Sequence, residues 1–328
     1  MKKILVTGAA GFIGSHLVDT LLAEGFEVVG LDNLRNGHLG NLEEALPHEH
    51  FNFVKGDIVD PFMCLRICKD IDVVYHLACM GVRHSLHSPF ENHKVNAEGT
   101  LNMLEGAKYN GVKHFFYIST SEVYGKVEEF PISETALPIP ITVYGASKLA
   151  GEHYTHAYNE CFGLSTTVLR IFNNYGPRAH YEGDSGELIP RTIINFFNGK
   201  AATQFGDGSV TRDFYYVKDT ARILMNMMDR PQLAGGPFNL GTSEEIKICD
   251  VIAMLAELMP EYNPTIDVLP ERLADVPRLW VNNSKLSALM DISSEISFKE
   301  GLVRTIAFYK KQWDSGLIKQ EVPVQNWT

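Results

Sequence analysis

A tyrosine and a lysine four residues apart are the first candidates for chemistry in this chain. Tyr144 and Lys148 stand in the run Tyr-Gly-Ala-Ser-Lys, within a stretch that predicts a helix. Residues four apart lie on one helix face. A phenol of ordinary pKa ~10 is a poor base at neutral pH, and a neighbouring ammonium favours its ionised form. Tyr144 could then take a proton from a substrate hydroxyl while hydride leaves the same carbon.

Hydroxyl and carboxyl side chains stand just upstream, after a stretch that predicts a strand. In the run Ile-Ser-Thr-Ser-Glu-Val-Tyr-Gly, Thr120 and Glu122 point to the same side if the backbone is extended. Thr120 can hydrogen-bond the reacting hydroxyl beside Tyr144, and Glu122 comes within reach of an adjacent carbon. Each feature alone has a plain structural explanation, because such pairs arise by chance in helices and strand ends carry solvated carboxylates. Together they predict proton transfer at two neighbouring carbons.

Three glycines near the N-terminus predict a phosphate-binding turn. Gly8, Gly11 and Gly14 lie between a predicted strand, Ile4–Thr7, and a predicted helix, Ile13–Glu24. Residues without a Cβ let the backbone approach a pyrophosphate, and the helix offers it free N–H groups and a positive dipole end. The placement between strand and helix makes the pattern a dinucleotide-binding signal.

An aspartate at the end of the second predicted strand indicates which dinucleotide binds. The Asp32 carboxylate can accept hydrogen bonds from the adenosine ribose hydroxyls, and it repels a 2′-phosphate. The cofactor is therefore expected to be NAD, although Arg35 leaves the phosphorylated form open.

The elements that must position these residues alternate as short apolar strands and helices. This alternation predicts an α/β fold, a Rossmann-type doubly wound parallel sheet. After about Asn173 the alternation of strands and helices loosens, and the sequence becomes rich in glycine and proline. This change predicts a smaller α/β substrate-binding lobe. We expect a cofactor domain over residues 1–173, to which about 214–240 return, and a substrate lobe over 174–213 and 241–328. The predicted strands are Ile4–Thr7, Glu27–Leu31, Phe51–Lys55, Val73–Leu77, Phe115–Ile118 and Thr167–Ile171, and the predicted long helices are Ile13–Glu24, Asn92–Tyr109 and Tyr144–Cys161.

Composition narrows the class of protein. The 328 residues carry 29 basic and 40 acidic side chains, a net charge of −11, which argues against a nucleic-acid binder. The five cysteines are scattered and form no metal-binding or CxxC spacing, so no metal is expected. The N-terminus begins at once with a strand, no apolar run approaches the ~20 residues of a membrane span, and we expect a cytoplasmic protein with no membrane partner.

The motifs together resemble the extended short-chain dehydrogenase/reductase family, in its NAD-dependent nucleotide-sugar epimerase/dehydratase branch. The glycine spacing is typical of it, and Asp57-Ile58 and His76-Leu77-Ala78 resemble its cofactor motifs. Asn96 resembles the family asparagine that supports the active-site end of the neighbouring strand. The resemblance implies cofactor-binding roles for Gly8, Gly11, Phe12, Ile13, Gly14, Asp32, Asn33, Asp57, Ile58, Leu77, Ala78, Asn96, Tyr144 and Lys148.

Different motifs resemble family members that catalyse different reactions. Thr-Ser-Glu-Val-Tyr-Gly is similar to GDP-mannose 4,6-dehydratases and UDP-glucuronate decarboxylases, whereas the run Gly-Val-Arg-His-Ser is similar to 4-epimerases. With Tyr144 as base for the C4 hydroxyl and Glu122 for the C5 hydrogen, 4,6-dehydration leads. Decarboxylation, 4-epimerisation and net C4 dehydrogenation stay open, as does a non-catalytic NAD(H) sensor on the same fold.

A second group of residues is expected on the nucleotide sugar. Asn173 resembles the family asparagine at the substrate diphosphate, and two arginine motifs resemble those that supply guanidinium groups to the diphosphate and ribose. The resemblance also implies a homodimer that pairs the two long helices Asn92–Tyr109 and Tyr144–Cys161. The expected substrate-binding residues are Arg83, Ser121, Asn173, Arg178, Arg212 and Arg272.

Overall fold

A seven-stranded parallel sheet forms the centre of the molecule. The structure is a computed structural model and describes residues 1–183, 186–271 and 276–318. The strand order is β11-β6-β5-β4-β1-β2-β3: β2 and β3 are added on one side of β1, and β4, β5 and β6 on the other, so the order switches between β1 and β4. Ligands of such sheets bind outside the carboxyl ends of the strands at this switch point. The predicted fold class, a Rossmann-type doubly wound sheet, is confirmed.

The sheet strands agree with the predicted apolar runs, and one more strand joins from later in the chain. Strand β11 pairs in parallel with β6 at the sheet edge. The strands are short and apolar because helices cover both faces and leave little room for polar side chains. They are β1 (Lys3–Thr7), β2 (Glu27–Asp32), β3 (Phe51–Lys55), β4 (Val73–His76), β5 (His114–Thr120), β6 (Thr166–Ile171) and β11 (Gly235–Leu240).

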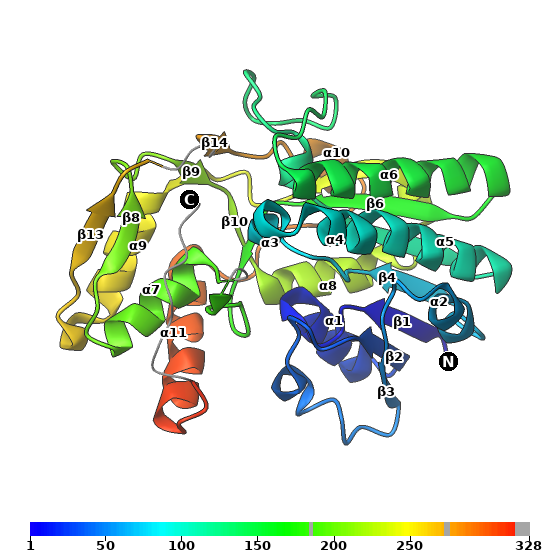
Figure 1. Cartoon of the computed structure of the whole chain (residues 1–328), viewed down its shortest axis with the longest axis horizontal. Coiled ribbons are helices and arrows are strands. Elements are labelled where there is room, and N and C mark those ends of the chain that lie inside the picture. Colours follow the sequence, from blue (N-terminus) through cyan, green and yellow to red (C-terminus); the bar gives the residue numbers. More distant parts are fainter. Residues whose placement is uncertain (184–185, 272–275, 319–328) are drawn as a thin grey trace.

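Two helical layers enclose the sheet (Figure 1). Ile4 packs into the apolar core beneath α1 (Phe12–Ala23) and α8 (Val217–Met227), while its neighbour Leu5 packs into the core on the other face. The helix expected over Asn92–Tyr109 begins earlier and contains one π-helical turn. The elements of this second layer are α2 (Pro61–Ile67), α3 (Val82–His87), α4 (Pro89–His93), the π turn (Lys94–Glu98), α5 (Gly99–Tyr109) and α6 (Val143–Phe162).

A smaller lobe stands beside the sheet and has its own apolar core (Figure 1). Three helices pack around aromatic side chains such as Phe196 and Tyr309, and short strands tie the lobe together. The domain boundaries predicted from the sequence remain a proposal. The elements after β6 are β7 (Asn173–Tyr175), α7 (Leu188–Phe197), β8 (Ala202–Phe205), β9 (Thr211–Arg212), β10 (Phe214–Tyr216), β12 (Ile246–Lys247), α9 (Ile248–Leu258), β13 (Ile266–Leu269), β14 (Arg278–Leu279), α10 (Ser284–Ser287) and α11 (Phe298–Asp314).

One local expectation is wrong. The backbone does not stay extended to Glu122, because β5 ends at Thr120 and Ser121–Val123 forms a 3-10 turn. The Thr120 hydroxyl oxygen caps this turn by accepting a hydrogen bond from the Glu122 N–H at 3.2 Å. Side-chain capping at a strand end competes with continued strand pairing, so the extended backbone ends at Thr120.

Bilayer-spanning helices are absent from the described ranges, where every helix is too short or too polar to cross a membrane.

Candidate active site

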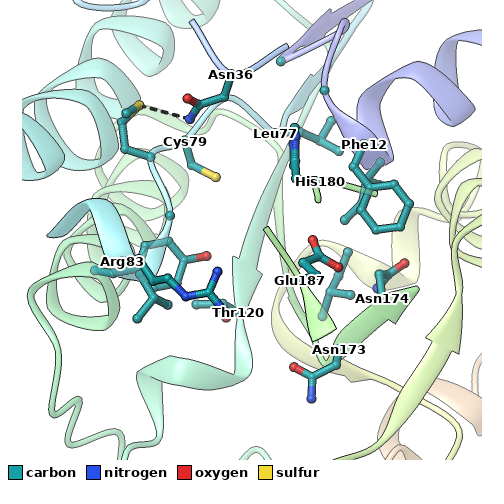
Figure 2. A pocket seen from close by; sticks show the side chains of 18 of the residues that line it. Phe12, Asn36, Leu77, Cys79, Arg83, Thr120, Asn173, Asn174, His180 and Glu187 are labelled. Atoms are coloured by element: carbon teal, nitrogen blue, oxygen red, sulfur yellow. Dashed lines mark hydrogen bonds between the residues drawn. The ribbon is translucent and has the colours of Figure 1, made fainter. Parts of the chain in front are cut away.

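A cavity of about 610 Å³ lies between the carboxyl ends of the sheet strands and the smaller lobe. Figure 2 shows that its walls bring together side chains from both parts, among them Phe12, Leu77, Arg83, Thr120 and Asn173. Most of the residues predicted from the sequence line this single cavity. They are Gly8, Gly11, Phe12, Ile13, Gly14, Asp32, Asn33, Asp57, Ile58, Leu77, Ala78, Arg83, Thr120, Ser121, Glu122, Tyr144, Lys148, Asn173 and Arg212.

The glycine turn is built so tightly that side chains are excluded. A Cβ at Gly14 would lie 2.1 Å from the carbonyl oxygen of Gly8. Gly8 itself has φ +70°, and a Cβ there would lie 2.9 Å from the Ala78 nitrogen. Such a cradle at the start of α1 suits a pyrophosphate, because N–H groups and the helix dipole face the ligand without steric hindrance. The residues present therefore fit NAD.

The acidic residues at the ends of β2 and β3 form the expected ribose and adenine side of this cradle. The Asp32 carboxylate is nearly buried and accepts hydrogen bonds from the N–H groups of Ala10, at 3.0 Å, and Leu34, at 2.8 Å. Burial raises its pKa, and these two hydrogen bonds oppose the shift. Asn33 donates to Asp57 at 2.9 Å, which fixes both side chains at the cavity wall. Asp32 thus holds the glycine turn in addition to its predicted ribose contact.

Arg35, the residue that kept NADP possible as the cofactor, is paired with another side chain. Arg35 forms a two-pronged ion pair with Glu91, and one of its hydrogen bonds is 2.8 Å long. A guanidinium committed to a carboxylate is less available for a 2′-phosphate, which agrees with NAD as the cofactor.

Tyr144 and Lys148 lie on one face of α6, as predicted, and both reach the cavity. Burial raises the Tyr144 pKa well above its ordinary value; the neighbouring Cys79 acts in the same direction, and a hydrogen bond with Thr120 opposes it. The Lys148 ammonium donates to the carbonyl oxygen of Ile118 at 2.6 Å, and burial lowers its pKa. In the protein alone the phenol therefore keeps its proton, and ionisation needs an added positive charge, which the nicotinamide of NAD supplies.

A buried ion pair fixes the strand ends beneath these residues. Glu152, one helical turn after Lys148, accepts hydrogen bonds from Arg170 of β6, including one of 2.6 Å, and one from Ser119 at 2.5 Å. Glu152 and Arg170 have only 6% and 4% of their surfaces exposed, so little solvent screens the pair. It locks α6 to the ends of β5 and β6, where Thr120 stands.

The polar groups on the lobe side are less completely paired. The Asn173 side-chain nitrogen is buried and has no hydrogen-bond partner among the described residues, although Asn173 lines the cavity. A buried donor without a partner is costly, so it marks a place for a ligand oxygen. Arg212 donates to the carbonyl oxygens of Thr211 and Val276 at 2.8 Å each, which holds its guanidinium at the wall.

Two predicted residues stand apart from this wall, and a third is not described by the structure. Arg178 was expected on the substrate, but it is absent from the described cavity wall and forms an ion pair with Asp19 of α1 at 2.6 Å. Asn96, grouped with the cofactor residues, is buried away from the cavity and binds the Met80 backbone and Ser147, which agrees with its supporting role. Arg272 lies outside the described residues.

Several cavity residues were not among the predicted site residues. Cys79 and His180 line the wall, and so does Glu187, which burial gives a pKa of about 8 despite the opposing charge of Arg83. Burial also lowers the pKa of His180 to about 4. Their positions come from loops that the fold brings to the cavity. Only the glycine-rich run around residue 183 hinted at such a loop.

The small lobe contributes several apolar side chains to the cavity wall. Phe205 of β8, Val210 and Ile248 of α9 line it, together with Thr203. Apolar lining of this kind suits a planar base.

Comparison with known proteins identifies the class. Residues 4–241 match the model of the NAD dependent epimerase/dehydratase family, and the chain belongs to that family. It is 34% identical to UDP-glucuronic acid decarboxylase 1 of Danio rerio in an alignment 328 positions long, which covers 98% of this chain and 76% of the relative.

Solved structures give the same fold with two other activities. A UDP-glucuronic acid 4-epimerase from Bacillus cereus, in complex with UDP-glucuronic acid and NAD, is 36% identical with a TM-score of 0.87, over 94% of this chain and 99% of that one. A dTDP-glucose 4,6-dehydratase from Streptomyces venezuelae, with NAD bound, is 28% identical with a TM-score of 0.89, over 95% and 98%. The chain is thus an NAD-dependent enzyme of the nucleotide-sugar epimerase, dehydratase and decarboxylase type.

Proposed function

We propose that this enzyme oxidises C4 of a nucleotide-activated hexose transiently, and that its lead reaction is 4,6-dehydration. The observation that carries the proposal is the position of Glu122, a carboxyl on the same cavity wall as Thr120 and Tyr144 and close enough to influence the Tyr144 pKa. Family members share C4 oxidation, so a second base beside the tyrosine determines the fate of the C4 ketone.

The chain's own residues supply each proton transfer. Tyr144 takes the proton of the C4 hydroxyl, which Thr120 orients by a hydrogen bond, and Lys148 stabilises the phenolate. NAD, when bound, would supply the hydride acceptor for C4 and the hydride donor for C6. The C4 ketone acidifies the C5 hydrogen. Glu122 removes this hydrogen as a proton and then, as the acid, gives the proton to the C6 hydroxyl, which leaves as water. A hydride at C6 and a solvent proton at C5 complete a 4-keto-6-deoxy sugar, and the proton taken by Tyr144 passes to solvent.

Decarboxylation is the second candidate, and two observations favour it. A UDP-glucuronic acid decarboxylase is 34% identical over nearly the whole chain. Arg83 also brings a cation to the cavity wall, where it could pair with a sugar carboxylate. In that reaction the C4 ketone accepts the electrons released when carbon dioxide leaves C5, and no C5 hydrogen is removed beforehand.

Mass spectrometry of products distinguishes these reactions. The NAD-loaded enzyme is incubated with UDP-, GDP-, CDP- and dTDP-sugars, including UDP-glucuronate. Loss of water supports dehydration, and loss of carbon dioxide establishes decarboxylation instead. An isomer of unchanged mass indicates epimerisation, loss of two hydrogens with matching NADH indicates a net dehydrogenase, and NAD binding without any turnover favours a sensor.

Substitution of Glu122 by Gln tests its role directly. We expect the dehydrated product to fall by roughly 10²–10⁴-fold, the usual contribution of a general base, because the amide cannot accept the C5 proton. C4 oxidation should continue, and a trace of enzyme-bound NADH should remain visible by absorbance. Unchanged dehydration would remove Glu122 from the mechanism.

We also propose that the enzyme acts as a cytoplasmic homodimer paired through α5 and α6. Large apolar side chains exposed at the ends of these helices, Tyr109 and Phe162, support this pairing. Light scattering of the purified protein measures its mass in solution, and a monomer would contradict the proposal.

A further inference from the structure

A buried tyrosine that the proposed chemistry does not use lies against Lys148. Tyr117 belongs to β5, is fully buried, and is absent from the part of the cavity wall that the structure describes. The Lys148 ammonium lies over the face of its ring, 4.3 Å from the ring centroid. The same ammonium donates to the carbonyl oxygen of Ile118, the next residue of β5, at 2.6 Å. Strand β5 therefore holds the Lys148 charge with both a carbonyl oxygen and an aromatic face.

The hydroxyl of Tyr117 makes a second contact with the same residue. It donates to the Lys148 carbonyl oxygen at 3.0 Å, so one side chain contacts both the backbone and the ammonium of Lys148. Helix α6 passes very close at this point, since a Cβ at Gly151 would lie 2.2 Å from the Tyr117 hydroxyl oxygen. The hydroxyl thus anchors the ring beneath α6, and the ring cannot move away from Lys148 without breaking that hydrogen bond.

An ammonium at this position needs partners that replace water. Only 3% of Lys148 is exposed, and burial lowers its pKa. A desolvated charge is costly unless other groups stabilise it. The face of an aromatic ring is negative, and its attraction for a cation is strongest where solvent is excluded. The Tyr117 ring therefore favours the charged form of Lys148 against the effect of burial.

The other titratable groups around Lys148 come from three parts of the chain. They are Tyr144 and Glu152 of α6, His76 of β4, and Cys79 of the segment after β4. Cys79 and Glu152 oppose the lowering of the Lys148 pKa, but Glu152 is already paired with Arg170. His76 is neutral near neutral pH, because burial lowers its pKa to about 3. Most of these groups are thus neutral or paired, and the ring face carries part of the stabilisation.

We propose that Tyr117 is a positioning residue for Lys148: its ring face keeps the buried ammonium charged and in place, and its hydroxyl fixes the turn of α6 that carries it. The inference rests on the proposed function only at the step that every candidate reaction shares, proton transfer at Tyr144. A charged Lys148 stabilises the Tyr144 phenolate. Removing the ring should lower the Lys148 pKa, so that the ammonium, and activity with it, is lost at a lower pH.

Lysine-selective NMR of the NAD-loaded protein, labelled with ¹³C at the ε carbon, tests the proposal without turnover. Protons over a ring face are shielded by its ring current, so the Lys148 signal, identified by its loss in Lys148→Arg, should lie upfield of lysines that contact no ring. Tyr117→Phe keeps the ring and should keep this shift, whereas Tyr117→Met replaces it with a flexible apolar side chain and should lose it. Titration of the same signal should give a Lys148 pKa about one pH unit lower in Tyr117→Met, the effect of one desolvated cation–π contact, and nearly unchanged in Tyr117→Phe.

Phe115→Leu is the matched control. It removes a buried ring from the same strand and the same apolar core, where that ring packs against His76 with the centroids 5.7 Å apart. We expect its thermal stability to fall as it does in Tyr117→Met, while the Lys148 signal and pKa stay those of wild type. With a substrate identified from the product panel, the alkaline limb of the pH–rate profile should move to lower pH in Tyr117→Met and stay in place in Phe115→Leu.

Three results would each overturn the proposal. The first is a wild-type Lys148 signal without the ring-current shift, which needs no variant. The others are an unchanged Lys148 pKa in Tyr117→Met and an equal fall of that pKa in Phe115→Leu. Thermal unfolding establishes that each variant is folded, and Tyr117→Leu is a second ringless variant if Tyr117→Met does not fold. Failure of every sugar nucleotide to turn over would contradict the proposed function, and the NMR titration would still decide this inference.

Discussion

The two walls of the cavity are built on different principles. On the sheet side, polar side chains are paired with one another: Asp32 with backbone N–H groups, Lys148 with a carbonyl oxygen, and Glu152 with Arg170. On the lobe side, Asn173 has a buried nitrogen without a partner among the described residues, and Glu187 has a carboxyl without one. Among the described residues the first wall is largely paired, with one buried nitrogen of Arg170 as an exception, and the second presents unpaired groups to a ligand.

This difference explains what each wall can contribute. A wall with satisfied hydrogen bonds positions a cofactor and a base precisely, because no rearrangement is needed when the ligand binds. A wall with unpaired groups discriminates between ligands, since each leaves a different set of groups unsatisfied. We therefore expect the sheet side to set the class of reaction, and the lobe side to set which sugar enters and in which orientation.

The largest expected effect lies on the sheet side, at Tyr144. Tyr144→Phe removes the hydroxyl that accepts the C4 proton, and kcat should fall by about 10²–10⁴-fold, as for loss of a general base. The glycine turn is untouched, so NAD content should stay that of wild type. Turnover is followed by product mass, and NAD by absorbance after denaturation. Tyr154→Phe on the same helix is the control, and full activity in Tyr144→Phe would refute the assignment.

The second effect tests whether the sheet-side wall is held by its buried ion pair. Glu152→Gln leaves the Arg170 guanidinium buried without its counter-charge, and removing one member of a buried pair costs about 3–5 kcal/mol. The Lys148 pKa should also fall further, because the Glu152 charge raises it. Urea unfolding measures the loss of stability, and the alkaline limb of the pH–rate profile measures the second effect, because the ammonium form of Lys148 is then lost at a lower pH.

An exposed pair provides the matched control. Asp314→Asn breaks the Lys310–Asp314 ion pair on the surface of α11, where an i,i+4 pair contributes only about 0.3–0.5 kcal/mol. Equal losses of unfolding free energy in the two variants would mean that burial does not make the Glu152–Arg170 pair more important for stability than an exposed pair.

The sheet side was also the part that could be predicted from the sequence. Apolar runs, glycine spacing and the four-residue interval from Tyr144 to Lys148 are local patterns, and each local pattern maps onto one element. Glu122 shows the limit of this reasoning. Its place on the cavity wall was expected, but the extended backbone used to argue for it was wrong, because the Thr120 side chain caps a turn there.

Most of the lobe side could not be predicted from the sequence, because its residues come from loops far apart in the chain. Nothing in the sequence near Glu187 shows that Arg83, about a hundred positions earlier, will lie close enough to alter its pKa. Likewise, a predicted substrate arginine, Arg178, is used as a structural tie to Asp19. Residue type alone could not distinguish an arginine that binds phosphate from one that joins two elements, since both roles exploit the same guanidinium.

The smallest expected effect sharpens this last distinction. Arg178→Gln breaks a partly buried ion pair with Asp19, and we expect a loss of about 1 kcal/mol in stability with KM changed less than twofold. Asp19→Asn should cost a similar amount, and the double variant should cost little more than either alone, because coupled partners are not additive. Arg212→Gln, by contrast, should raise KM, since Arg212 lies on the cavity wall. A large rise in KM for Arg178→Gln would return that residue to the substrate site, and the two walls would then differ less than the structure indicates.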